Sequence, residues 1–234
     1  MLSRPQNCSE NVGATQARIS EACRAYSRSV DSVTLLAVSK GQSSAAIDSA
    51  ARAGIEHFGE NFLQEGLPKM ESLKGRELTW HFIGRLQANK TRTVAELFDW
   101  VHGVDRLKIA ERLSAQRPSH AAPLNVCLQL HLGGEASKGG VEAAEIAPLA
   151  LAVRGLPGIK LRGIMCMPPA ESATDRQRQW FREARQVFDY LNERGLGLDT
   201  LSMGTSADFE SAIAEGSTIV RIGTAIFGPR DAGT

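Results

Sequence analysis

The sequence predicts an α/β protein built as a single (β/α)8 TIM barrel with an extra helix before the first strand. Eight short apolar runs alternate with longer amphipathic stretches along the 234 residues. The apolar runs are continuous rather than alternating in polarity, as in strands that are buried on both faces of a parallel sheet. The length also suits eight strand–helix units, since such barrels usually need about 250 residues. An open, doubly wound parallel sheet is the alternative that the same alternation allows.

The expected strands follow one another at regular intervals. They are VTLLAVS (33–39), IEHFG (55–59), WHFIG (80–84), DWVHGV (99–104), LNVCLQLHL (124–132), LRGIMCM (161–167), TLSMG (200–204) and IVRIG (219–223). No linker, low-complexity segment or change of composition separates them. We therefore expect one domain that spans residues 1–234.

The clearest helix is expected over residues 173–195. Its apolar side chains recur at helical spacing, at Trp180, Phe181, Ala184, Val187, Phe188 and Leu191. Gly195 follows as a C-terminal stop. A similar pattern over residues 12–29 precedes the first strand and predicts the extra N-terminal helix.

Composition limits the classes of partner. The chain is 42% hydrophobic, and its 27 basic and 26 acidic residues give a net charge of +1, so no overall field attracts nucleic acid or anionic lipid. There is no membrane-length apolar run and no hydrophobic leader, so we expect a cytoplasmic protein. The four cysteines include no CxxC pair, which indicates reduced thiols rather than disulfides or a zinc site.

Chemistry in a parallel barrel is expected at the C-terminal mouth, where the residues that follow each strand converge. Small and polar residues follow the strands here: Lys40, Glu60 and Asn61, the segment 85–89, the segment 165–167, GTSAD (204–208), and Arg221 with GTAIFG (223–228). The loops after strands seven and eight of such barrels commonly hold phosphate through backbone N–H groups. The sequence therefore predicts a ligand site here that includes a phosphate subsite.

The phosphate subsite is expected from Gly204, Ser206, Gly223 and Thr224. Taken alone, Ser206 is better explained as the cap of a helix that starts near Asp208. Gly223 taken alone can be a packing residue. Two such loops on adjacent strands favour the phosphate interpretation for both.

Lys40 comes directly after a buried strand. An isolated lysine at a strand end is normally just solvated, but a partly desolvated amine beside a phosphate site is nucleophilic and can form a Schiff base with an aldehyde. Pyridoxal 5′-phosphate (PLP) is such a phosphate-bearing aldehyde. Arg221 is then expected at the pyridine nitrogen, where a guanidinium accepts no proton and so weakens the electron sink.

Six stretches carry a resemblance to a known family. They are LLAVSKGQ (35–42), HFGENFLQE (57–65), WHFIGRLQANK (80–90), SKGG (137–140), GIMCMPP (163–169) and LSMGTSADFESAIAEGSTIVRIGTAIFG (201–228). Together they resemble the YggS/PROSC family of pyridoxal phosphate homeostasis proteins, which is related in fold to the N-terminal domain of alanine racemase. The resemblance implies intracellular PLP (vitamin B6) homeostasis, in which PLP is held as a Schiff base and passed to PLP-dependent apoenzymes without catalytic turnover.

The resemblance also implies roles for particular residues. Lys40 would carry the Schiff base, Arg221 would face the pyridine nitrogen, and Asn61 would lie near the phenolic oxygen of PLP. The phosphate would be held by Ser206, Gly223 and Thr224. Lys138 resembles a second lysine of the family, which is an alternative amine or a release route for PLP; a solvated loop charge explains it equally well.

A PLP-dependent amino-acid racemase is the alternative function. Enzymes that resemble alanine racemase have a β-rich domain after the barrel and a catalytic tyrosine that acts across a dimer interface. Here six residues follow Gly228, and the two tyrosines, Tyr26 and Tyr190, fall in expected outer helices. A racemase also needs a second acid/base on the opposite face of the substrate. We therefore expect a monomeric PLP carrier rather than a catalyst.

Three histidines are a separate feature. His81, His102 and His131 lie in or beside different strands, without the HxxxH or HExxH spacing of a metal-binding helix. We expect hydrogen-bonded histidines in the core and no metal site.

Overall fold

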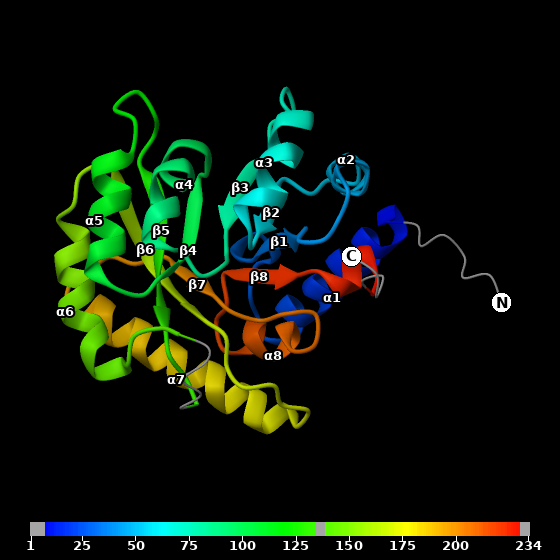
Figure 1. The fold of residues 1–234 in the computed structure, drawn as a ribbon. Coiled ribbons are helices and arrows are strands. Elements are labelled where there is room, and N and C mark those ends of the chain that lie inside the picture. Colours follow the sequence, from blue (N-terminus) through cyan, green and yellow to red (C-terminus); the bar gives the residue numbers. More distant parts are fainter. Residues whose placement is uncertain (1–7, 134–138, 230–234) are drawn as a thin grey trace.

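The computed structural model describes residues 8–133 and 139–229. Its strands are β1 (Thr34–Val38), β2 (His57–Glu60), β3 (Thr79–Phe82), β4 (Trp100–Val104), β5 (Leu124–Leu130), β6 (Ile159–Cys166), β7 (Thr200–Ser202) and β8 (Ile219–Ile222). Neighbouring strands pair in parallel in chain order, and β1 pairs with β8. This closure confirms the predicted barrel and excludes the open sheet (Figure 1).

Helices cover the outside of the barrel (Figure 1). They are α1 (Cys8–Ala25), α2 (Ser44–Arg52), α3 (Leu63–Ser72), α4 (Thr91–Leu97), α5 (Leu107–Gln116), α6 (Ala143–Arg154), α7 (Thr174–Glu193), α8 (Phe209–Ala214) and α9 (Thr224–Phe227), with the 3-10 turns η1 (Val30–Ser32) and η2 (Ala88–Lys90). The helix predicted over 173–195 is confirmed as α7. No helix of the described residues is both long enough and apolar enough to cross a membrane.

The extra N-terminal helix is present as α1, but its predicted boundaries were wrong. It begins at Cys8 rather than at residue 12, and it ends at Ala25 because the chain turns at Ser27, which has a positive φ of 54°. The turn is closed by a hydrogen bond from Arg28 N to Cys23 O, of 2.8 Å. α1 packs against α2, α8 and α9 and covers the seam where β8 meets β1 (Figure 1).

Buried side chains divide into two clusters along the barrel wall. In β1, for example, Ala37 belongs to the large cluster that packs under the helices, whereas the adjacent Leu36 belongs to a small second cluster. The members of the small cluster come from five strands: Leu36, Trp100, Cys127, Met165 and Ile219. Since successive strand residues point to opposite faces, the small cluster fills the barrel interior and the large cluster lies outside it.

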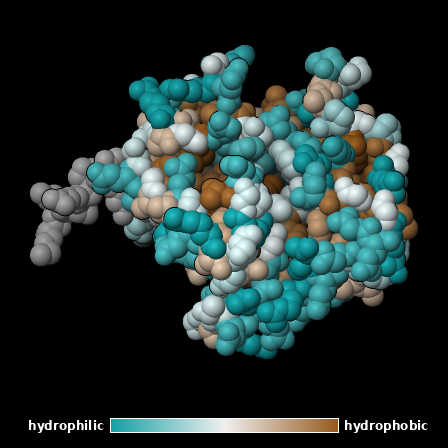
Figure 2. All heavy atoms as spheres, turned by 180° about the vertical axis from the view of Figure 1, so that it is seen from behind, coloured by the Kyte–Doolittle hydropathy of each residue, from teal (hydrophilic) through white to brown (hydrophobic). Residues whose placement is uncertain are grey.

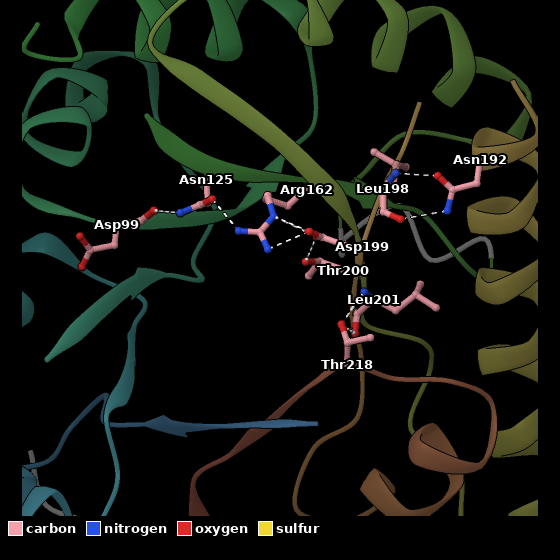
Figure 3. A network of polar contacts seen from close by, with 9 residues as sticks. All are labelled: Asp99, Asn125, Arg162, Asn192, Leu198, Asp199, Thr200, Leu201 and Thr218. Atoms are coloured by element: carbon pink, nitrogen blue, oxygen red, sulfur yellow. Dashed lines mark hydrogen bonds and ion pairs between the residues drawn. The ribbon is translucent and has the colours of Figure 1, made fainter. Parts of the chain in front are cut away.

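A polar network closes the N-terminal end of the barrel (Figure 3). Arg162 Nε donates to both carboxylate oxygens of Asp199, at 2.9 and 3.0 Å, and Arg162 Nη1 donates to Asn125 Oδ1 at 2.8 Å. The Arg162 guanidinium also lies 4.7 Å from the centre of the Trp100 ring. These contacts join β4, β5, β6 and the start of β7, and they leave the opposite, C-terminal end free for a ligand site.

Charges on the helical surface are largely balanced by neighbours. Hydrophilic side chains form a band across the lower part of Figure 2, where α7 lies. Arg178 and Arg182 of α7 both pair with Glu215, at 2.7 and 3.0 Å. These two arginines of α7 are therefore ion-paired at the surface.

Candidate functional site

A pocket of about 310 Å³ opens at the C-terminal ends of the strands. The six residues to which the resemblance assigns a role toward PLP all line it: Lys40, Asn61, Ser206, Arg221, Gly223 and Thr224. The described lining contains two basic side chains, those of Lys40 and Arg221, and no carboxylate. The pocket is therefore suited to an anionic ligand.

Lys40 is half-buried in a tight turn that follows β1. The turn is closed by a 3.0 Å hydrogen bond from Gln42 N to Ser39 O, and it passes through Gly41, whose φ is 70°. Gly41 N donates to Glu65 Oε2 of α3 at 2.7 Å. This turn ends the hydrophobic strand and leaves the lysine in the wall of the pocket.

Arg221 lies at the base of the pocket and is only 5% exposed. Its Nη1 donates to the backbone oxygen and to the hydroxyl of Ser202, at 2.6 and 2.8 Å, and its Nη2 donates to Cys166 O at 2.9 Å. Burial lowers the pKa of Arg221 from its usual 12.5, although a guanidinium keeps its charge at any pH a protein tolerates. The pocket therefore has a fixed cation held by two neighbouring strands.

Ser206 connects the two loops that were predicted to hold phosphate. Its hydroxyl oxygen accepts a 3.4 Å hydrogen bond from Ala225 N, at the start of α9. It does not cap α8, because Asp208 takes the cap position and binds Thr205 N and Thr205 Oγ1, at 2.6 and 2.9 Å. The capping explanation of Ser206 is thus wrong, and its side chain faces the loop after β8.

The glycines of these loops differ in position. Gly223 lines the pocket, and a Cβ added there would lie 3.3 Å from Val38 O, so the backbone passes close to β1. Gly204 is not among the lining residues. Its φ is 94°, and a Cβ would lie 2.6 Å from the Cβ of Ala212, so this glycine lets the loop pack on α8.

Asn61 follows β2 and lines the pocket from the other side. Its Oδ1 atom is buried and has no hydrogen-bond partner among the described residues. Buried polar atoms normally have a partner, so this atom is available to a ligand. Lys138 lies outside the described residues.

Comparisons with known proteins identify the family of this chain. Residues 14–231 match the family model described as "Alanine racemase, N-terminal domain". The "Pyridoxal phosphate homeostasis protein" of Pseudomonas aeruginosa is 53% identical over 224 residues, which cover 96% of each chain. This chain belongs to the family of pyridoxal phosphate homeostasis proteins. The resemblance noted in the sequence is therefore confirmed.

Solved structures place the family in its wider fold. PipY of Synechococcus elongatus, a "COG0325 family member … with PLP bound", is 36% identical with a TM-score of 0.80, covering 90% of this chain and 100% of that one. Alanine racemase of Clostridium difficile shares the fold at 13% identity and a TM-score of 0.76, covering 96% of this chain and 58% of that one. The predicted likeness to the N-terminal domain of alanine racemase is therefore confirmed for the fold.

A buried ion pair behind the pocket is the functional feature that the sequence did not predict. Lys69 Nζ of α3 donates to Glu60 Oε1 and to Ser39 O, both at 2.8 Å, and Ser39 Oγ donates to the same Glu60 oxygen at 2.6 Å. Burial raises the pKa of Glu60, and the hydrogen bonds from Lys69 and Ser39 oppose this shift. The pair joins the ends of β1 and β2. Lys40 and Asn61 lie just beyond these two ends.

The sequence held one signal for this pair. Leu63, Gly66 and Lys69 recur every third residue on the buried side of α3, so the lysine occupies a position where an apolar residue is expected. Glu60 was expected at the mouth of the barrel, but it is fully buried and is not among the residues that line the pocket.

The prediction of hydrogen-bonded core histidines is confirmed for His81 and His102, whereas His131 is only partly buried. His81 and His102 are fully buried and hydrogen-bonded to each other at 2.9 Å. His131 lies 3.2 Å from Gly139 O. Tyr190 lies on α7 and Tyr26 directly follows α1, and both are about two-fifths exposed, at 40% and 42%.

Proposed function

We propose that this protein binds PLP as a Schiff base on Lys40 and passes it to PLP-dependent apoenzymes, as part of vitamin B6 homeostasis. The observation that carries the proposal is that Lys40, Arg221 and the two small-residue loops line one pocket. Its volume of about 310 Å³ suits a small cofactor. The names of the relatives and the PLP-bound structure of PipY support the choice of ligand.

The lining residues fit the parts of PLP. We assign Ser206, Gly223 and Thr224 to the phosphate, because they supply hydroxyl and backbone N–H donors on two adjacent loops. We assign Asn61 to the phenolic oxygen, toward which the NH2 group of its side-chain amide would donate a hydrogen bond; the unpartnered Oδ1 atom is an acceptor and would not itself make this contact. Lys40 Nζ would join the aldehyde carbon in a C=N bond, and the aldehyde oxygen would leave as water.

Arg221 would face the pyridine nitrogen and keep it unprotonated, since a guanidinium donates hydrogen bonds and accepts none. An unprotonated ring is a poor electron sink, so bound PLP would be held without being used.

The racemase alternative has little support in the lining. Racemisation needs an acid/base on each face of the substrate α-carbon. Among the described lining residues, only Lys40 can serve as a base at neutral pH, since the lining includes no histidine, tyrosine, cysteine or carboxylate. We therefore infer that the protein is not a catalyst. The monomeric state and the cytoplasmic location remain predictions.

Chemical trapping tests the proposal. The purified protein is incubated with PLP, reduced with borohydride and digested, and the adduct is located by mass spectrometry. We expect the adduct on Lys40, its loss in Lys40→Ala, and its persistence in a Lys138→Ala control. An adduct on Lys138 alone, or none at all, would contradict the proposal.

A further inference from the structure

A row of hydrogen-bonded side chains crosses the inside of the barrel below the pocket. His57, His81 and His102 belong to the adjacent strands β2, β3 and β4. The contact from His57 Nδ1 to His81 Nε2 is 2.9 Å, and the contact from His81 Nδ1 to His102 Nε2 is also 2.9 Å. His102 Nδ1 then lies 2.8 Å from Ser202 Oγ, which in turn accepts from Arg221. The row therefore ends at the cation of the pocket.

The opposite end of the row reaches the N-terminal side of the barrel. His57 is the first residue of β2 and is half-buried. It lines a separate hollow together with Glu56 and Thr34, near the start of β1. The row thus runs from the base of the ligand pocket to the other end of the barrel.

Donor and acceptor chemistry gives this row one direction. Arg221 can only donate, so the Ser202 oxygen accepts from it and the Ser202 proton is donated to His102 Nδ1. His102 Nε2–H then donates to His81 Nδ1, and His81 Nε2–H donates to His57 Nδ1. The opposite order would leave Ser202 with two incoming donors and no acceptor for its own proton. Each imidazole is therefore assigned the tautomer with its proton on Nε2.

Electrostatics agrees with neutral rings. Burial, followed by the charge of Arg221, lowers the pKa of His102 to about 3. Burial, followed by His102, lowers the pKa of His81 well below 6.5. A neutral imidazole has one donor and one acceptor, as each internal link of the row requires.

We propose that His102, backed by His81 and His57, is a positioning residue for Arg221. His102 Nδ1 accepts the hydrogen bond from the Ser202 hydroxyl, so that a Ser202 lone pair faces the guanidinium and holds it at the base of the pocket. If these three histidines served only to fill the barrel interior, apolar side chains would serve as well and would need no hydrogen-bond partners. What the imidazoles add is an acceptor at Ser202. The role toward a ligand rests on the proposed function, in which Arg221 faces the PLP ring.

The tautomers can be measured without PLP. In unliganded protein labelled with ¹⁵N-histidine, long-range proton–nitrogen correlation spectra distinguish Nε2–H, Nδ1–H and charged rings. We expect neutral Nε2–H tautomers for His81 and His102 between pH 6 and 8. A charged ring, or a proton on His102 Nδ1, would overturn the proposal whether or not the protein binds PLP.

Paired substitutions test the positioning role. His102→Asn keeps an acceptor near the position of Nδ1, whereas His102→Leu removes it. We expect His102→Leu to shift the absorbance of bound PLP in the same direction as Arg221→Ala and to release PLP about tenfold faster, as for one lost hydrogen bond. His102→Asn should restore most of the wild-type spectrum.

A barrel-interior control separates positioning from stability. Leu36→Ala opens a cavity in the same interior, and Leu36 has no side-chain hydrogen bond to lose. It should lower the free energy of unfolding and leave the spectrum of bound PLP unchanged. Equal spectra for His102→Leu and wild type would overturn the proposal, provided that trapping places PLP on Lys40 in both. Failure of trapping in the wild type would instead contradict the proposed function.

Discussion

Ser206 illustrates how the role of one side chain depends on which loop it faces. Its hydroxyl lies 3.4 Å from Ala225 N, in the loop after β8, although Ser206 itself follows β7. Thr224 lies at the first position of α9 and lines the same pocket. The two hydroxyls are therefore placed to act on one anionic group.

The double substitution Ser206→Ala with Thr224→Ala tests this pairing. Each hydrogen bond to a charged group contributes about 1.5–3 kcal/mol, so the pair should weaken noncovalent PLP binding by roughly two to four powers of ten. Binding is measured by absorbance titration, with circular dichroism to confirm folding. Ser172→Ala, outside the pocket, is the matched control. PLP binding that is unchanged in the double variant would contradict the phosphate assignment.

The buried histidines predict how stability depends on pH. In the unfolded chain a histidine titrates near pH 6.5, whereas burial lowers the pKa of His102 to about 3 and that of His81 well below 6.5. Below pH 6.5 the unfolded chain therefore binds protons that the folded protein does not. The free energy of unfolding must then fall as the pH falls, by up to about 1.4 kcal/mol per pH unit for each histidine.

This pH dependence is measured by urea unfolding between pH 5.0 and 6.5, above the range where most carboxylates titrate. The matched comparison is His102→Asn, which removes one of the titrating groups. Its stability should depend less steeply on pH, by up to about 1.4 kcal/mol per pH unit. An identical slope in the two proteins would show that His102 is not held neutral.

Local sequence patterns could predict some of these residues and not others. Lys40 and Arg221 could be predicted because each is tied to one recognisable strand, and strand ends meet at the mouth of a barrel. The row from His57 to Ser202 could not be predicted, because each of its contacts joins different strands. The same holds for Lys69, whose acceptors are Glu60 of β2 and Ser39, directly after β1.

The strands β6 and β7 approach each other closely at Gly163. A Cβ on this residue would lie 1.7 Å from Thr200 O, so only glycine permits the observed pairing. Two residues further along, Met165 pairs with Ser202, whose side chain holds Arg221. The close approach of β6 and β7 therefore also helps to place Ser202, which accepts a hydrogen bond from Arg221 of the pocket.

Two glycine substitutions test this close approach. Gly163→Ala should force the strands apart and lower the free energy of unfolding by about 3 kcal/mol. Gly13→Ala is the control: Gly13 is an exposed residue of α1 with nothing within 4 Å of an added Cβ, so the substitution should raise stability by about 0.5–1 kcal/mol. Both are measured by urea unfolding. Similar stabilities for the two variants would contradict the close packing of β6 on β7.

The ends of elements were less predictable than their order. All eight strands lie where apolar runs predicted them, but α1 is displaced toward the N-terminus relative to the expected 12–29. Its end depends on a turn at Ser27, a residue type that does not mark a helix stop in the way that glycine does. Apolar spacing shows that a helix exists, whereas its boundary depends on the turn that follows.

Closure of the barrel brings the residues of the site together. The pairing of β1 with β8 brings Lys40 beside Arg221 and Gly223, which are far apart in the sequence. Alternating strands and helices could predict eight units but left an open sheet possible. Closure depends on strand tilt and register, which no local pattern encodes.

We have proposed that this barrel holds PLP without turning over amino acids. The most direct test is a proton NMR experiment in which the PLP-loaded protein is incubated with L-alanine in deuterated water, followed by chiral analysis for D-alanine. We predict slow or absent loss of the α-proton signal and no D-alanine, because the lining described here offers Lys40 as a base on one face only. Exchange and racemisation at about 1–1000 per second, the ordinary enzymatic range, would contradict the claim and identify a racemase.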